Sequence, residues 1–237
     1  MTAIAVVIPA YRVAQQIVAL IGRIPPVVTR IIVVDDACPE HSGVLVQQQV
    51  SDPRVQLVFH AQNRGGGGAV ISGVRAALEA GADIVVKLDG DSQYDPELIP
   101  YLVQPIIDGN ADVTKGNRFF FLEDVAQMPG VRLFGNAVLS FVNKAVSGYW
   151  DVMDPTNGFI AIHAEVLHML PLEKLEPRYF FESDLLFRLG TLRAVVQDMP
   201  VRAHYGDEQS SLRVGSTELS FPLKYASRLI KRLFYNH

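Results

Sequence analysis

The feature that most constrains the fold is a regular alternation in the first half of the chain. Short runs rich in Val and Ile alternate with longer segments in which apolar residues recur every three or four positions. The short runs indicate strands and the longer segments indicate helices. Their order predicts an α/β fold with a mostly parallel, twisted sheet flanked by helices. We expect strands at Ala3–Ile8, Arg30–Asp35, Arg54–Phe59 and Asp83–Leu88, and helices at Val13–Arg23, Ser42–Val50, Gly68–Ala80 and Pro96–Ile107.

The second half of the chain has a less regular pattern. We expect a strand at Ala111–Lys115, a helix at Leu133–Ser147, a helix carrying Phe181–Leu186, a last strand at Val195–Val201 and a C-terminal helix at Ser216–Tyr235. The pattern predicts one domain over residues 1–215, with a first half (1–115) and a second half (116–215), followed by an amphipathic segment over 216–237.

Composition limits the class of protein. With 49% apolar and 19% charged residues among 237, the chain can bury a sizeable core. A formal net charge of -4 argues against a nucleic-acid partner. The single cysteine, Cys38, excludes an internal disulfide and fits a reducing compartment. We see no signal peptide and no uncharged apolar run of the ~18–20 residues that span a membrane, so we expect a cytoplasmic location.

Two carboxylates follow the fourth expected strand at a spacing of two residues. Asp89 and Asp91 come directly after an apolar run, and residues i and i+2 project to the same side at a strand end. With the amide oxygen of Gln93 they form an oxygen-ligand set that suits Mg²⁺ or Mn²⁺, ions that bridge to phosphates. The alternative is a polar turn after a buried strand, because Asp and Gly are ordinary turn residues.

Seven motifs in this order resemble family 2 of the glycosyltransferases, and within it the dolichyl-phosphate mannosyltransferase-like enzymes. The motifs are Val7–Tyr11, Val33–Asp36, Asn63–Ala69, Leu88–Gln93, Gly116–Phe119, Thr156–Phe159 and Phe181–Leu186. The resemblance implies a GT-A-type domain with a nucleotide-binding half before residue 115 and an acceptor half after it. It also implies metal-dependent, inverting transfer of a sugar from a UDP- or GDP-sugar to a polyprenyl phosphate.

The donor nucleotide is expected at the carboxyl ends of the strands, where parallel α/β sheets bind ligands. The resemblance puts the first strand end beside the base, on which a Tyr ring can stack. The residues expected to contact the nucleotide are Pro9, Ala10, Tyr11, Asp35, Asp36, Asn63, Gly67 and Asp89. The alternatives are a packed Tyr, Asp residues that cap a helix, and a glycine-rich helix start. Arg12-Val13 stands where the family usually has Asn-Glu, so the base is left open.

Basic residues of the second half are the candidates for the acceptor phosphate. Arg118 and Arg132 match basic positions of the lipid-phosphate subgroup, and Arg binds phosphate through two parallel hydrogen bonds. Asn136 follows Arg132 by one helical turn, and Arg202 follows the last strand, close to His204. The alternative for each Arg is a surface salt bridge.

Three carboxylates are the candidate catalytic groups. These are Asp91, Glu182 and Asp184, of which the last two lie near the start of a helix. A carboxylate can accept the proton of an attacking hydroxyl, whereas a phosphate acceptor needs no strong base. The alternative is that the helical acids only complement the helix dipole.

The C-terminal helix is strongly amphipathic. Its apolar face is opposed by Lys224, Arg228, Lys231 and Arg232, with no acidic residue from Leu219 onward. This pattern is typical of helices that lie in a membrane interface, and it predicts peripheral contact with the inner face of the cell membrane. The alternative is a surface helix docked on the domain.

Three other functions stay open at this point. A sugar-phosphate nucleotidylyltransferase would carry a Gly-rich signature with Arg and Lys after the first strand, where this chain has Pro9-Ala10-Tyr11. A non-catalytic relative that binds nucleotide sugars is disfavoured by the intact Asp89, Asp91 and Gln93 set. A glycosyltransferase that acts on a glycan hydroxyl remains an alternative.

Overall fold

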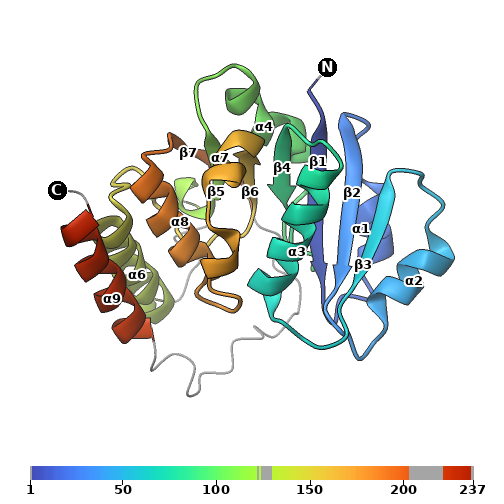
Figure 1. Ribbon diagram of the computed structural model, residues 1–237, viewed down its shortest axis with the longest axis horizontal. Coiled ribbons are helices and arrows are strands. Elements are labelled where there is room, and N and C mark those ends of the chain that lie inside the picture. The colour runs from blue at the N-terminus through green and yellow to red at the C-terminus, as the bar shows by residue number, and fades with distance from the viewer. Residues whose placement is uncertain (1, 122, 124–129, 203–220, 236–237) are drawn as a thin grey trace.

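The computed structural model describes residues 2–121, 123, 130–202 and 221–235. This part of the chain forms one seven-stranded sheet in the order β3-β2-β1-β4-β6-β5-β7 (Figure 1). Strand β6 runs antiparallel to both neighbours, and the other paired strands run parallel. The strands are β1 (Ile4–Ala10), β2 (Val28–Asp35), β3 (Val55–Phe59), β4 (Ile84–Lys87), β5 (Val113–Asn117), β6 (Ile160–His163) and β7 (Val196–Pro200).

Helices cover both faces of the sheet, as Figure 1 shows. The α-helices are α1 (Ile17–Gly22), α2 (Ser42–Gln49), α3 (Gly66–Glu79), α4 (Ile99–Ile107), α6 (Gly130–Ser147), α7 (Ala164–Met169), α8 (Phe181–Leu192) and α9 (Phe221–Tyr235). Short 3₁₀ turns lie at η1 (Pro96–Leu98), η2 (Arg118–Phe120) and η3 (Leu172–Lys174).

Strand β1 contributes side chains to two hydrophobic cores, one on each face of the sheet. Its side chains alternate between the two faces of the sheet. Ile4, Val6 and Ile8 join the core beneath α1, α2 and α4. Ala5 and Val7 join the opposite core beneath α3, α7 and α8. A strand buried on both faces therefore reads as a near-continuous apolar run, which is the signal that predicted the parallel sheet.

The predicted mostly parallel sheet is confirmed, and the four strands expected in the first half are all present within a few residues of their expected bounds. Among the described residues, one strand and one α-helix were not expected: β6 and α7. Strand β6 lies outside the regular alternation of strands and helices, and its antiparallel place between β4 and β5 depends on contacts far apart in sequence. The predicted helix start at Ser216 lies outside the described residues.

Helix α9 packs against α6 and α8 at one end of the molecule (Figure 1). Its basic side faces the domain. The Arg228 guanidinium lies 2.6 Å from Asp184, which is fully buried on α8. Lys224 lies 2.6 Å from Glu176, and the Tyr225 hydroxyl bonds Asn143 and Ser183. The alternative of a helix docked on the domain therefore describes how α9 sits.

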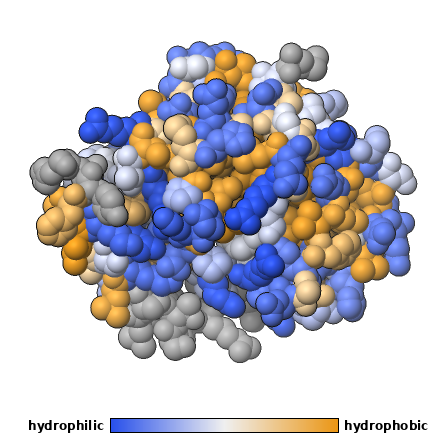
Figure 2. All heavy atoms as spheres, viewed as in Figure 1, coloured by the Kyte–Doolittle hydropathy of each residue, from blue (hydrophilic) through white to orange (hydrophobic). Residues whose placement is uncertain are grey.

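The docked orientation leaves the apolar side of α9 outward. The exposed fractions are 75% for Leu223, 56% for Ile230, 58% for Leu233 and 79% for Phe234. In Figure 2, hydrophobic atoms gather at the edge of the molecule where α9 lies. The helix is therefore inverted relative to an ordinary surface helix, which turns its apolar face to the core. Among the described residues, no helix is long and apolar enough to cross a membrane.

We expect Arg228→Ala to lower the free energy of unfolding by about 3 kcal/mol, because it leaves the buried Asp184 carboxylate without one of its cations. Arg188, 3.0 Å from the other Asp184 oxygen, limits the loss. Urea denaturation measures the change. The exposed Lys231→Ala on the same helix is the control and should stay within about 0.5 kcal/mol of wild type. Equal stability of the two variants would contradict the docked ion pair.

Candidate active site

The centre of the site is an ammonium held between two carboxylates. Lys87 is the last residue of β4, and its Nζ lies 2.8 Å from Asp89 Oδ1 and 3.2 Å from Glu182 Oε1. Asp89 follows β4, whereas Glu182 lies in the first turn of α8. Burial alone would lower the pKa of Lys87, but the charges of Asp89 and Glu182 outweigh burial and raise it. Lys87 therefore joins the two halves of the chain as a cation.

The segment Asn157–Phe159 closes this group from one side. A Cβ atom on Gly158 would lie 2.1 Å from Asp89 Oδ2 and 2.5 Å from Lys87 Nζ, so any side chain at this position would displace the ion pair. The neighbouring Phe159 stacks on Tyr94, with ring centroids 5.5 Å apart. Two of the sequence motifs thus pack against each other at the strand end.

Asp91 and Gln93 lie in the loop after Asp89. Asp91 Oδ1 accepts a hydrogen bond of 3.0 Å from the Gln93 backbone N–H, and Ser92 between them has a left-handed φ of 61°. Among the described residues, Asp89 Oδ2 accepts no hydrogen bond, and no three His, Cys, Asp or Glu side chains converge to form a metal cluster. The oxygen donors at hand still fit Mg²⁺ or Mn²⁺, which take carboxylate and amide oxygens and fill other positions with water and phosphate.

The two acids after β2 have internal partners. Asp35 accepts hydrogen bonds of 2.7 Å from the backbone N–H groups of Cys38 and Gly43, and Gly43 lies in the first turn of α2, whose N-cap residue is His41. Asp36 accepts from His60 Nδ1 at 2.7 Å and from the backbone of Arg64 and Gly65, each at 2.8 Å. Both carboxylates are buried and shape the loops at the sheet edge. Asp35 thus binds the first turn of α2 without occupying its N-cap position.

The other residues that we expected to contact the donor nucleotide differ in their exposure. Tyr11 is 43% exposed at the end of β1, whereas Ala10 is fully buried. A Cβ on Gly67 would lie 2.6 Å from the Glu176 carbonyl oxygen, so this glycine makes room for the protein's own chain. Asn63 donates from Nδ2 to the Asp36 carbonyl at 3.3 Å. Pro9 is half-buried.

Arg118 is engaged with a buried acid. Its Nε and Nη2 lie 2.7 and 2.9 Å from the two oxygens of Asp154, which is fully buried. Burial raises the pKa of Asp154, but the Arg118 guanidinium outweighs burial and leaves the pKa below its usual value. Arg118 thus sits just past β5, as expected, but in a bidentate pair within the protein.

The other acceptor candidates lie around α6 and β7. Asn136 lines a groove of about 300 Å³, together with Phe119, Leu133, Ala137, Ser140, Phe141, Lys144 and Met153. Arg202 is exposed, with its guanidinium 4.6 Å from the Phe121 ring centroid. The Arg132 side chain and His204 lie outside the described residues.

Of the two acids of α8, only Glu182 faces the site. Asp184 binds Arg228 through Oδ1 and Arg188 through Oδ2, and Oδ2 also accepts from the Glu176 backbone N–H. The carboxylate is fully buried among these partners. The structure therefore assigns Asp184 to the docking of α9, and we do not retain it as a candidate base.

A second lysine lies deeper beside the site. Lys115 on β5 is fully buried and donates to the Asn157 carbonyl oxygen. Burial lowers the pKa of Lys115 to about 8 despite the nearby charges of Asp154 and Glu182. Burial has the opposite effect on the acid Asp198, whose pKa it raises to about 6. Asp198 Oδ2 accepts hydrogen bonds from Asn117 Nδ2 and from the Met153 backbone N–H.

Sequence reasoning missed Lys87, Lys115 and Asp154. One signal was present: a Lys at the end of an otherwise apolar strand is costly unless paired, and Lys87 shares the side of Asp89. The pairing of Lys87 with Glu182 had no local signal, because the two residues are far apart in the sequence.

The family comparison decides the class of this site. The model for glycosyl transferase family 2 matches residues 5–170, which include the Asp89–Gln93 loop and the Asn157–Phe159 segment. The chain belongs to glycosyl transferase family 2. As a family member it is an enzyme that transfers a glycosyl group.

Similar proteins include several named for lipid-phosphate acceptors. The UDP-N-acetylglucosamine–dolichyl-phosphate N-acetylglucosaminyltransferase of Methanococcus voltae is 27% identical over 95% of this chain and 94% of the relative. The undecaprenyl-phosphate mannosyltransferase of Micrococcus luteus is 29% identical over 82% of this chain and 81% of the relative. Family 2 membership and likeness to the dolichyl-phosphate mannosyltransferase-like subgroup are thus confirmed.

Solved structures confirm the GT-A-type fold. Glucosyl-3-phosphoglycerate synthase from Mycobacterium tuberculosis, in a complex with Mn²⁺, UDP and glucosyl-3-phosphoglycerate, superposes with a TM-score of 0.72 at 22% identity. The match covers 96% of this chain and 80% of that structure. At this identity the likeness concerns the fold.

We expect stability to rise with pH between pH 8 and 10.5 because of Lys115. In the folded state its pKa is lowered from 10.5 to about 8, so below pH 8 the folded protein carries the full cost of a buried charge. Between these values the unfolded chain binds more protons, so unfolding becomes less favourable as pH rises, by about 3 kcal/mol in total.

Urea denaturation at several pH values, compared with Lys115→Met, measures this contribution. The difference in unfolding free energy between the variant and wild type should favour the variant below pH 8 and shrink toward pH 10.5. The exposed Lys174→Met controls for other groups that titrate in this range. A difference that is independent of pH would refute the assignment.

Proposed function

We propose that this enzyme transfers a sugar from a nucleotide-sugar donor to a polyprenyl phosphate, with inversion at the anomeric carbon. The main observation behind the proposal is that Asp89 and Glu182 both pair with the ammonium of Lys87 at the carboxyl edge of the sheet. In this proposal, this edge joins the donor half to the acceptor half. The lipid-phosphate acceptors in the names of the relatives support the choice of acceptor.

The donor lies across the carboxyl ends of β1, β2 and β4 in this proposal. The exposed Tyr11 ring stacks on the base, beside Pro9 and Ala10. Asp35 and Asp36 act indirectly, because their hydrogen bonds fix the loops that border the nucleotide. Asp89, Asp91 and Gln93 would hold Mg²⁺ or Mn²⁺. When bound, such an ion stabilises the negative charge of the leaving diphosphate.

In the transfer step, an oxygen of the acceptor phosphate forms a bond to the anomeric carbon while the bond from that carbon to the diphosphate breaks. The attacking oxygen is already anionic, so no strong base is required. Glu182 fits this chemistry, because its pairing with Lys87 suits a carboxylate that orients the site. A hydroxyl acceptor would instead need a carboxylate placed to take a proton.

The acceptor phosphate is assigned to the α6 side of the site, where Arg118, Arg132, Asn136 and Arg202 were expected. Arg118 reaches the phosphate either beside Asp154 or by exchanging that partner. The apolar groove next to Asn136 offers a surface for the first part of a lipid chain.

Membrane contact is assigned to the outward apolar side chains of α6 and α9. Phe134 and Phe141 of α6 are 72% and 63% exposed, in addition to the exposed apolar residues of α9. Lys224, Arg228 and Arg232 are engaged with the domain, so the four-cation attraction expected from the sequence is reduced. Contact with the inner face of the cell membrane would thus depend mainly on apolar burial.

We expect Asp91→Ala to lower kcat/KM for transfer to polyprenyl phosphate by at least about 10²-fold, because it removes a carboxylate that supports the charged leaving group. The assay follows labelled sugar from a panel of UDP- and GDP-sugars into the lipid fraction with Mn²⁺ present. The exposed Glu97→Ala, a matched loss of one acid, should retain wild-type turnover.

Three results would count against this proposal. Full activity of Asp91→Ala would remove the metal-site assignment. Efficient transfer to a soluble glycan, with polyprenyl phosphate inert, would favour the glycan-hydroxyl alternative. Binding of nucleotide sugars without any transfer would favour a non-catalytic role.

We expect Ile230→Ser and Phe234→Ser together to reduce liposome binding at least tenfold, because each removes about 1.5 kcal/mol of apolar burial. Co-sedimentation with liposomes of mixed neutral and anionic lipids measures binding. Val44→Ser, an exposed apolar residue on α2, is the control and should bind as wild type does. Unchanged binding of the double variant would exclude this face of α9 as the contact.

A further inference from the structure

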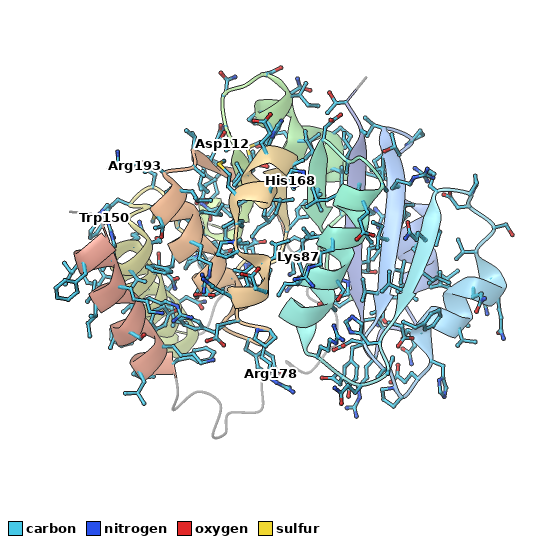
Figure 3. All side chains as sticks on the ribbon, in the orientation of Figure 1. Lys87, Asp112, Trp150, His168, Arg178 and Arg193 are labelled. Atoms are coloured by element: carbon cyan, nitrogen blue, oxygen red, sulfur yellow. The ribbon has the colours of Figure 1, made fainter. Side chains whose placement is uncertain are left out.

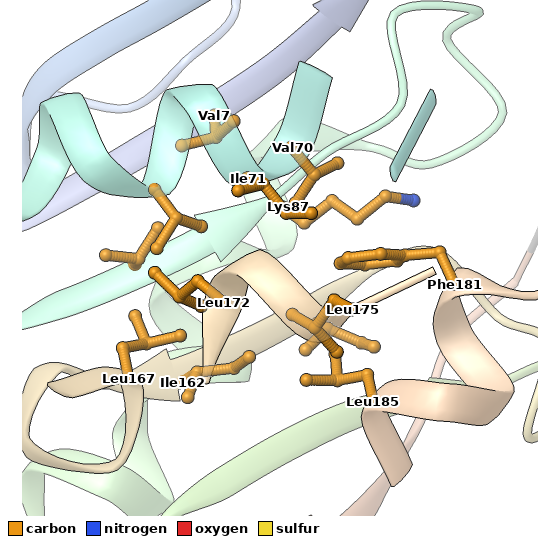
Figure 4. Close-up of a pocket in the computed structure, with 13 residues that line it drawn as sticks. Val7, Val70, Ile71, Lys87, Ile162, Leu167, Leu172, Leu175, Phe181 and Leu185 are labelled. Carbon is orange, nitrogen blue, oxygen red and sulfur yellow. The ribbon is translucent and has the colours of Figure 1, made fainter. Parts of the chain in front are cut away.

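Lys87 is placed as a built-in cation of the donor site. Its aliphatic stem lines a small apolar cavity of about 20 Å³, together with Val7, Val70 and Phe181. Its ammonium extends beyond the cavity, as Figure 4 shows. In the whole molecule it lies between the sheet and the helices that cover one face (Figure 3). The apolar wall therefore limits where the stem can lie and directs the charge to the carboxylates.

The two carboxylate oxygens of Asp89 have different surroundings, because only one of them pairs with the Lys87 ammonium. Oδ1 lies 2.8 Å from Lys87 Nζ, whereas Oδ2 accepts no hydrogen bond within the described chain and faces the Gly158 backbone. The Asp89 side chain is 33% exposed, compared with 10% for Lys87 and 19% for Glu182. A ligand that enters from solvent therefore meets Asp89 with one oxygen already taken.

The charge of Lys87 also affects cation binding at Asp89. A fixed positive charge within hydrogen-bond distance of a cation-binding carboxylate repels a second cation. A diphosphate reduces that repulsion, because it brings negative oxygens of its own to the same place. The site should then favour the cation together with the diphosphate over the cation alone.

We propose that Lys87 is a positioning residue of the donor site: it holds Asp89 and Glu182 in one bridge, leaves Asp89 a single oxygen for a divalent cation, and so makes cation binding depend on the donor diphosphate. This inference rests on the proposed function only in assigning the diphosphate to this edge of the sheet. Lys87 would then influence the order in which the cation and the donor bind, in addition to linking β4 to α8 through its ion pair with Glu182.

A purely structural role is the competing explanation. In that case Lys87 only ties β4 to α8, and its loss lowers stability without changing the affinity of a folded protein for a cation. The two roles separate in a binding measurement that needs no turnover.

The test is a titration of the full chain with Mn²⁺ alone, followed by the EPR signal of the free ion, and repeated with UDP and with GDP. Lys87→Met keeps the length of the stem and removes the charge. We expect it to bind Mn²⁺ alone at least fivefold more tightly than wild type, and to gain correspondingly less affinity when the nucleotide is added. Lys174→Met, an exposed lysine of η3, should match wild type.

Two further variants keep the proposal open to refutation. Asp89→Asn should remove the gain when combined with Lys87→Met, which locates the bound ion. Glu182→Gln leaves Lys87 with Asp89 alone, so Mn²⁺ affinity should fall at least twofold, and this variant decides the matter if Lys87→Met does not fold. Unchanged or weaker Mn²⁺ binding by folded Lys87→Met, or unchanged or tighter binding by Glu182→Gln, would overturn the role. Failure of polyprenyl phosphate as acceptor leaves these results unaffected.

Discussion

The structure around the site depends on the cost of placing charge away from water. An ionised group in a protein interior persists only with opposite charge or hydrogen bonds close by. Lys87, Lys115, Asp154 and Asp184 are all buried. Each has at least one partner from another element, so each pairing helps to fix one segment against another. These contacts act together with apolar packing between α6, α8 and α9.

The parallel half of the fold could be predicted from the sequence because its signals are local. A strand such as β1 shows its burial on both faces in consecutive residues, and the alternation with helices gives the direction of the strands. The motifs also predict the donor edge of the site at Asp89, which follows β4 in the structure. Strand β6 could not be predicted in this way, because it lies outside the alternation of strands and helices and pairs antiparallel with β4 and β5.

The ion pairs of the second half had no signal of this kind. Nothing next to Glu182 or Asp184 in the sequence distinguishes their partners, and both are equally suited to the first turn of a helix. Only the three-dimensional structure separates the acid that faces the site from the acid that holds α9. The orientation of α9 was hidden for the same reason: an amphipathic pattern identifies two faces of a helix but does not say which one packs inward.

The docking of α9 also bears on the order in which the protein is assembled during translation. Asp184 leaves the ribosome well before Arg228, so its carboxylate first meets Arg188 of the same helix and gains its second cation later. Glu182 lies in the same helical turn, and the correct placing of that turn completes the bridge to Lys87. The turn that carries Glu182 would therefore gain its last ionic support only after α9 has been synthesised. The outward apolar side chains of α9 would appear at the same stage of synthesis.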